Sequence, residues 1–169
     1  VQEDEILELI KGQHTSDLET KIKFNSLGII TKNRPQMLNT CLQSYIQNQQ
    51  FFGRKLNFSI FDDSTESVRD QNLLNIEKLS QSLGVTIFYV GVREKKSFAD
   101  KLIQKGVCKE SVEFALFDVE NCSYTTGTNR NALLLSSVDE LIFSSDDDIR
   151  CHAVLPPCGS EKPIITSGE

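Results

Sequence analysis

At 169 residues, with 38% hydrophobic and 25% charged residues, the chain has the size and composition of one soluble domain with its own core. Its formal net charge of −6 excludes a general nucleic-acid binder, because such a protein needs a basic stripe to neutralise phosphates. No run approaches the roughly 18 to 20 apolar residues of a membrane span, so this segment contains none.

Residues 1–20 combine an acidic, partly amphipathic stretch with a polar run, and they predict a short helix and a linker outside the main domain. Residues 22–31 are partly alternating and then apolar, which predicts a strand entering a buried sheet. Pro35 suits the first position of a helix, and apolar residues then recur at helical spacing until Gly53. The main domain is therefore predicted to begin with a strand and a helix.

The same alternation continues along the chain. Residues 56–61 predict a second strand, and the helical spacing that begins at Val68 ends at Gly84. Residues 85–90 predict a third strand, and their Val, Ile, Phe and Tyr content favours a buried position in the sheet. One or two helices are expected within residues 97–118.

A polar loop over residues 121–128 precedes a helix predicted over residues 129–138, which leads to a fourth strand over residues 140–145. Strands that alternate with helices predict an α/β fold, a Rossmann-like three-layer α/β/α sandwich with a mostly parallel sheet and right-handed crossovers. We expect this domain to span residues 21–155 and the segment 156–169 to be irregular.

Three consecutive aspartates, Asp146, Asp147 and Asp148, directly follow the fourth predicted strand. Open α/β sheets bind ligands at the carboxyl ends of their strands. In an extended backbone Asp146 and Asp148 project to the same side, which makes them candidate ligands for one Mg²⁺ or Mn²⁺ ion. The alternative is a solvated acidic loop, because charged side chains are mostly exposed.

Three other polar clusters stand at predicted strand ends or helix starts. The first contains Thr31, Asn33, Arg34 and Pro35, in the pattern T-x-N-R-P. Taken alone, that pattern is also typical of a turn with a helix-starting proline. The other two clusters are Asp62-Asp63-Ser64-Thr65 and the segment from Gly127 to Leu133, which contains Arg130 and Asn131.

The order of these clusters resembles the nucleotide-sugar-binding half of a GT-A-fold glycosyltransferase of the family-2 type, over roughly residues 22–150. In that family the T-x-N-R-P loop contacts the nucleotide, so the resemblance implies donor contacts for Thr31, Asn33 and Arg34. The family's D-D-G-S segment supplies an aspartate to the nucleobase. Here Asp62 and Asp63 match it without the glycine, and a helix N-cap role for one of them stays open.

The rest of the resemblance concerns the metal site and its neighbours. The family's G-x-x-x-A-R-N-x-G segment implies donor contacts for Arg130 and Asn131, although Leu133 replaces its final glycine. Asp146, Asp147 and Asp148 match the D-x-D motif, which implies a cation at the outer two aspartates and donor contact by Asp147. The implied cofactors are Mn²⁺ or Mg²⁺ and a UDP- or GDP-linked sugar.

The resemblance implies a metal-dependent, inverting glycosyltransferase acting on a glycan, lipid or protein acceptor. Its catalytic base would lie in an acceptor-binding half, and the chain ends about twenty residues after Asp148, so we expect an incomplete catalytic domain and assign no catalytic residue. The alternative is a non-catalytic nucleotide-sugar-binding or protein-interaction module of a larger protein. Five scattered cysteines, an odd number, indicate reduced thiols and a cytoplasmic location.

Overall fold

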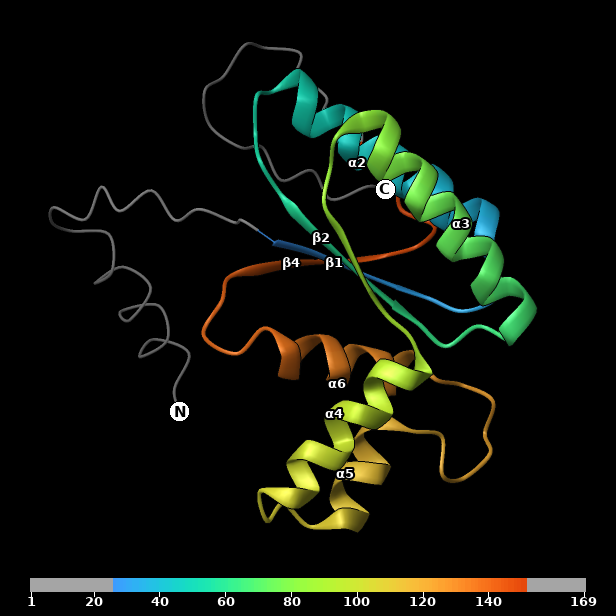
Figure 1. The fold of residues 1–169 in the computed structure, drawn as a ribbon, viewed down its shortest axis with the longest axis vertical. Helices are drawn as coiled ribbons and strands as arrows, with labels where there is room; N and C mark the ends of the chain where they lie inside the picture. Colours follow the sequence, from blue (N-terminus) through green and yellow to red (C-terminus); the bar gives the residue numbers. More distant parts are fainter. Residues whose placement is uncertain (1–25, 152–169) are drawn as a thin grey trace, which may run out of the picture.

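The described residues form a four-stranded, all-parallel sheet with helices on both faces, an arrangement compatible with a Rossmann-like fold (Figure 1). The computed structural model describes residues 26–151. The strands are β1 (Ser26–Thr31), β2 (Asn57–Asp62), β3 (Ile87–Val90) and β4 (Ile142–Asp146), in the order β3-β2-β1-β4. The helices are α2 (Pro35–Phe51), α3 (Glu66–Leu83), α4 (Val92–Gln104), α5 (Lys109–Leu116) and α6 (Thr126–Ser136). The predicted α/β alternation and parallel sheet are confirmed.

The two faces of the sheet carry two separate apolar cores. Successive side chains of a strand point to opposite faces, so Leu27 and Ile29 of β1 pack against α2 and α3, whereas Ile30 packs against α6. In Figure 1, α2 and α3 lie on one side of the sheet and α4, α5 and α6 lie on the other. Five of the six residues of β1 are buried, as expected for a strand covered on both faces.

Gly28 allows α6 to approach the sheet closely. A Cβ atom at this position would lie only 2.2 Å from Leu133 Cδ1, and Leu133 is almost fully buried on α6. Any larger residue at position 28 would therefore displace Leu133 or the whole of α6. This close contact holds α6 against the middle of β1.

The structure differs from the sequence predictions at several places, most clearly in the third strand, the last helix and the fourth strand. The predicted burial of the third strand is wrong, because β3 pairs only with β2 among the described residues and leaves Phe88 exposed. The last helix starts at Thr126 rather than Asn129, because the Thr125 carbonyl already accepts a hydrogen bond from the Asn129 backbone N–H. The fourth strand spans Ile142–Asp146, so it begins two residues later and ends one residue later than predicted.

Three of the sequence predictions fall wholly or partly outside the described residues. They are the N-terminal helix and linker over residues 1–20, the start of the first strand before Ser26, and the irregular segment 156–169. Within residues 26–151, no helix combines the length and the apolar character needed to cross a membrane.

Candidate functional site

A cleft of about 350 Å³ opens at the carboxyl ends of β1 and β4. The chain runs from β1 outward to β2 and β3, whereas β4 lies on the other side of β1, so this point is where the strand order reverses. Open α/β sheets bind ligands at such a reversal, and the volume suits a small ligand. The cleft is lined by Ile30, Thr31, Lys32, Arg34, Ser123–Thr126, Asn129 and Asp146–Asp148.

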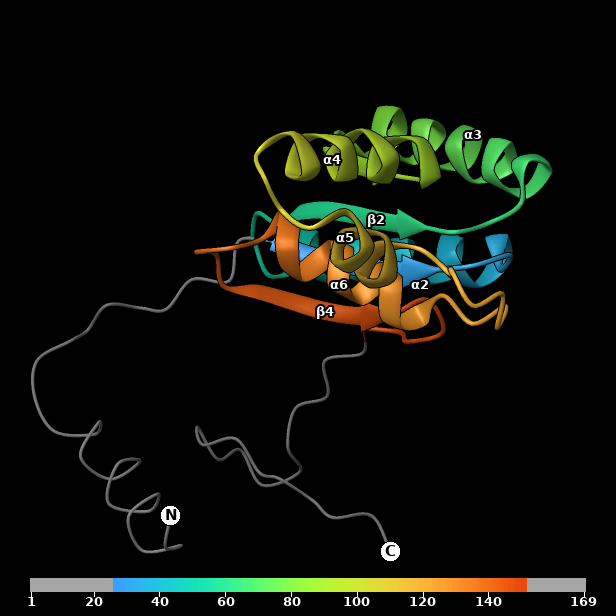
Figure 2. The ribbon, with the colours of Figure 1, turned by 90° about the horizontal axis from the view of Figure 1, so that it is seen from below.

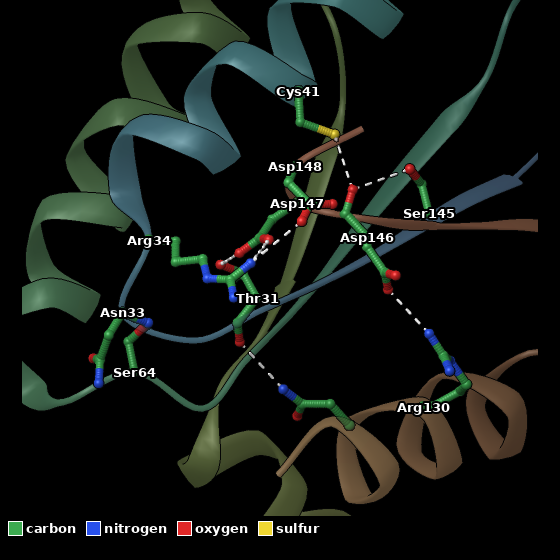
Figure 3. A network of polar contacts seen from close by, with 11 residues as sticks. Thr31, Asn33, Arg34, Cys41, Ser64, Arg130, Ser145, Asp146, Asp147 and Asp148 are labelled. Carbon is green, nitrogen blue, oxygen red and sulfur yellow. Dashed lines mark hydrogen bonds and ion pairs between the residues drawn. The ribbon is translucent and has the colours of Figure 1, made fainter. Parts of the chain in front are cut away.

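Asp147, the middle aspartate, is buried and bonded within the protein. Its carboxylate accepts a hydrogen bond of 2.7 Å from Thr31 Oγ1 and one of 3.1 Å from Arg34 Nη1. The side chain of Asp147 is 5% exposed, whereas that of Arg34 is 56% exposed. Asp147 therefore joins the ends of β1 and β4 and positions the guanidinium group of Arg34 at the cleft (Figure 3).

The outer aspartates, Asp146 and Asp148, are half-exposed and paired with different arginines. Asp146 accepts a hydrogen bond of 3.0 Å from Arg130 Nη2 on α6, and Asp148 lies 3.5 Å from Arg34 Nη1. Figure 3 shows the Asp146 carboxylate directed toward Arg130 and the Asp148 carboxylate on the side of Arg34. The predicted extended backbone through Asp148 is wrong, because β4 ends at Asp146 and the Ile149 N–H bonds back to the Asp146 carbonyl.

The chemistry of Asp146 and Asp148 suits a hard cation. Within residues 26–151, no three His, Cys, Asp or Glu side chains form a ready-made metal site. Magnesium is nevertheless commonly held by one or two carboxylates completed by substrate phosphates and water. The two exposed ion pairs with arginine are of a kind that contributes about 0 to 1 kcal/mol, so both carboxylates can exchange an arginine for a cation at little cost.

Asn33 joins two turns of the chain. Its side-chain oxygen accepts hydrogen bonds from the backbone N–H and the hydroxyl of Thr65, at 2.9 and 3.3 Å, and its own N–H donates to Ser64 Oγ. Asn33 adopts a positive φ of 56°, which asparagine tolerates better than most residues. Its side chain thus connects the β1–α2 turn with the start of α3 and does not line the cleft.

Asp62, predicted to contact a nucleobase, is 1% exposed and is fully engaged inside the protein. Its carboxylate accepts hydrogen bonds from the Ser64 backbone N–H, Asn72 Nδ2 and the Tyr89 hydroxyl, at 2.7 to 2.8 Å. Burial and the adjacent Asp62 carboxylate raise the pKa of Tyr89 above its usual range. Asp62 therefore anchors β2 to α3 and β3, away from the cleft.

Asp63 forms an ion pair with Lys95 on α4, and both side chains are more than nine-tenths buried. Lys95 Nζ also donates a 2.9 Å hydrogen bond to Asn129 Oδ1. The sequence analysis did not single out Lys95. The one feature of the sequence that indicates its burial is the spacing of four residues to Ala99, which places both on the same buried face of α4. Neither Asp63 nor Lys95 lines the cleft.

The α6 segment contributes one predicted residue and one unpredicted residue to the site. Arg130 pairs with Asp146, as described above. Asn129 lines the cleft, and its Nδ2 donates to the carbonyl oxygens of Thr31 and Phe61, both at 3.3 Å. Asn131 instead donates to the Ala115 carbonyl and points to α5. Asn129 thus connects the ends of β1 and β2 to the Lys95 network.

Two side chains of α2 contact β4 from the face of the sheet opposite α6. Cys41 Sγ lies 3.6 Å from the Asp146 carbonyl oxygen, and the Tyr45 hydroxyl lies 3.1 Å from Ser145 Oγ. Burial raises the pKa of the Cys41 thiol to about 12. Cys41 therefore stays protonated near neutral pH, which makes it a packing residue rather than a nucleophile.

The structure brings together five of the predicted site residues in the cleft, places one at its edge and places four elsewhere. The cleft contains Thr31, Arg34, Asp146, Asp147 and Asp148, with Arg130 bonded to its edge, whereas Asn33, Asp62, Asp63 and Asn131 have internal partners outside it. Comparisons of the chain with protein-family models, curated proteins and solved structures found no match.

Proposed function

We propose that the cleft binds a nucleoside-diphosphate sugar together with a divalent cation, and that the protein acts in glycosyl transfer of the inverting type. The observation that carries this proposal is the pairing of Asp146 and Asp148 with Arg130 and Arg34 at the reversal of strand order. Carboxylates and guanidinium groups side by side are suited to an anion that arrives with its own cation. The order of the sequence motifs supports the same substrate class.

Ligand binding exchanges the partners of these four side chains. Asp146 and Asp148 would hold the cation, and Arg34 and Arg130 would bind the diphosphate, because planar guanidinium groups match phosphate oxygens in two-point hydrogen bonds. Two ion pairs are lost and two charge-assisted contacts to the ligand are gained. Asp147 keeps its bonds to Thr31 and Arg34 during this exchange, because it is buried, and so holds Arg34 in place.

This arrangement supplies what the departure of a nucleoside diphosphate requires. A bound cation stabilises, as a Lewis acid, the negative charge that the leaving group acquires. Arg34 and Arg130 bind phosphate oxygens and add preorganised positive charge at the same place. Direct displacement also needs a base for the acceptor hydroxyl, and we assign none of residues 26–151 to that role.

The first test is a calorimetric titration of the chain with UDP and with GDP, each in the presence of Mn²⁺ and in the presence of chelator. We expect one nucleotide to bind only with the cation, because the carboxylates and the diphosphate repel each other without it. Equal binding with chelator would contradict the cation's role. Absence of binding by both nucleotides would contradict the proposed function.

A second measurement separates an enzyme from a binding module. The chain is incubated with UDP- and GDP-linked sugars and Mn²⁺, and the release of free nucleotide is followed over time. Release above the rate of the Asp148→Ala variant supports glycosyl transfer or its hydrolytic side reaction. Tight binding without release would favour the non-catalytic module.

A further inference from the structure

The structure leaves the nucleobase of the proposed ligand without its expected partner. Asp62 is saturated by Ser64, Asn72 and Tyr89, and Asp63 is paired with the buried Lys95. Neither aspartate lines the cleft. A base that binds in this cleft must therefore be recognised by other side chains.

Tyr124 is an exposed aromatic side chain on the wall of the cleft. It is 86% exposed, an unusual position for a large aromatic side chain. Hydrogen bonds within the loop that carries it, residues 118–125, and to Lys32 hold this loop in place. The Asp118 carboxylate accepts hydrogen bonds from the backbone N–H groups of Cys122 and Ser123, and Lys32 Nζ donates to the Ser123 carbonyl. Figure 2 shows this loop, between α5 and α6, extending past the carboxyl ends of the strands.

The backbone of this loop holds an uncommon conformation. Asn121 and Ser123 have positive φ values of 54° and 64°, and such a conformation persists in non-glycine residues only where the surroundings enforce it. The bonds to Asp118 provide that enforcement directly at Ser123 and next to Asn121. Tyr124 is thus presented by a held loop rather than by a free one.

Thr125, the next residue, offers an unused hydroxyl group in the same cleft. Thr125 is 91% buried, and its Oγ1 has no hydrogen-bond partner among the described residues. A buried hydroxyl without a partner is costly and uncommon. Because Thr125 lines the cleft, a ligand there can supply the missing partner.

We propose that Tyr124 and Thr125 form the nucleobase subsite of the cleft, an inference that rests on the proposed function. The Tyr124 ring stacks on the face of the base, and the Thr125 hydroxyl bonds to its polar edge. Every base has a face that stacks, and a hydroxyl both donates and accepts, so a uracil or a guanine can make both contacts, and the titration with UDP and GDP identifies which one the cleft prefers. The diphosphate remains at Arg34 and Arg130.

The test compares nucleotide binding with binding of inorganic pyrophosphate, which lacks a base. Both ligands are titrated with Mn²⁺ into the wild-type chain, Tyr124→Ala, Tyr124→Phe and the matched control Phe114→Ala, an exposed aromatic residue outside the cleft. We expect Tyr124→Ala to weaken binding of the preferred nucleotide about 5- to 100-fold. Tyr124→Phe and Phe114→Ala should leave it nearly unchanged, and pyrophosphate binding should stay the same in all four proteins.

A second variant tests the hydroxyl independently of the ring. Thr125→Val keeps the shape of the side chain and removes an unpartnered group, so we expect unchanged or higher thermal stability together with several-fold weaker nucleotide binding. A merely structural role of Thr125 would change stability and not binding. Unchanged binding in this variant would overturn the role assigned to the hydroxyl.

The outcomes separate this inference from the function on which it rests. Nucleotide binding unchanged by Tyr124→Ala, or nucleotide and pyrophosphate binding weakened equally, would overturn the base subsite and leave the cation–diphosphate site standing. Wild-type binding of pyrophosphate without any preference for a nucleotide would also overturn the subsite. Absence of binding by either ligand would instead contradict the proposed function itself, and the subsite with it.

Discussion

Thr31 and Asp147 are 116 residues apart in the sequence, yet their side chains are joined by a buried hydrogen bond of 2.7 Å. This bond connects the carboxyl ends of the neighbouring strands β1 and β4. It also explains why the three consecutive aspartates differ in character. Asp147 faces inward and is used by the fold, whereas Asp146 and Asp148 remain half-exposed at the cleft.

Replacing Asp147 should therefore lower stability. In Asp147→Ala, Thr31 Oγ1 loses its buried acceptor and Arg34 loses one of its two carboxylate partners, so we expect the free energy of unfolding to fall by about 1 to 3 kcal/mol. Urea denaturation monitored by circular dichroism measures the change. An unchanged transition midpoint would show that the Thr31–Asp147 bond does not hold the two strand ends together.

Replacing Asp148, in contrast to replacing Asp147, should weaken ligand binding and leave stability nearly unchanged. Its half-exposed carboxylate has one ion pair of 3.5 Å with Arg34, so Asp148→Ala should change the free energy of unfolding by less than about 0.5 kcal/mol. Cation-dependent nucleotide binding should fall more than tenfold in calorimetric titration, because removing a ligand to the cation removes a charge-assisted contact. Asp70→Ala, which also removes an exposed aspartate paired with arginine, is the matched control and should bind normally. Normal binding by Asp148→Ala would exclude Asp148 from the cation site.

The Lys95–Asp63 pair should show strong coupling. Lys95→Met leaves the Asp63 carboxylate buried without its cation, and we expect a loss of about 3 to 5 kcal/mol in the free energy of unfolding. The double variant Lys95→Met with Asp63→Leu removes both charges and should lose much less than the sum of the two single variants. Denaturant titrations of the four proteins measure the coupling. Additive losses would mean that the two side chains do not stabilise each other.

Stability should fall at alkaline pH because Tyr89 is held in its neutral form. Its folded-state pKa lies above the unfolded value of about 10. The favourable contribution is therefore complete below about pH 10 and is lost as the pH rises above it. Tyr89→Phe should be less stable at pH 7, since Asp62 loses a hydrogen-bond donor, but should lose less stability than the wild type between pH 9 and 11.

Denaturant titrations across this pH range measure the effect, with Tyr124→Phe as the control. Tyr124 is exposed and no residue within 26–151 accepts a hydrogen bond from its hydroxyl, so its variant should keep the wild-type dependence on pH. Parallel pH profiles for the wild type and Tyr89→Phe would contradict the contribution of Tyr89.

The alternation of strands and helices could be predicted because it depends on local signals. Pro35 at the start of α2 and the left-handed Gly84 at the end of α3 mark helix boundaries directly in the sequence. The burial of β3 could not be predicted, because Val, Ile, Phe and Tyr favour central and edge strands alike. Among residues 26–151, β3 pairs with β2 alone and is therefore an edge strand, and strand pairing is a property of the assembled sheet.

The candidate site divides in the same way. The sequence by itself determined that polar clusters would stand at the ends of parallel strands, and hence that Thr31, Arg34 and the three aspartates would meet at one edge. Only the tertiary structure decided which of those side chains remain available to a ligand. Asp62 accepts hydrogen bonds from Asn72 and Tyr89, and Asp63 forms an ion pair with Lys95. These partners lie on other helices and strands, and packing of the domain brings them close. A residue type shows what a side chain can bind, whereas its availability depends on which groups the fold brings within hydrogen-bonding distance.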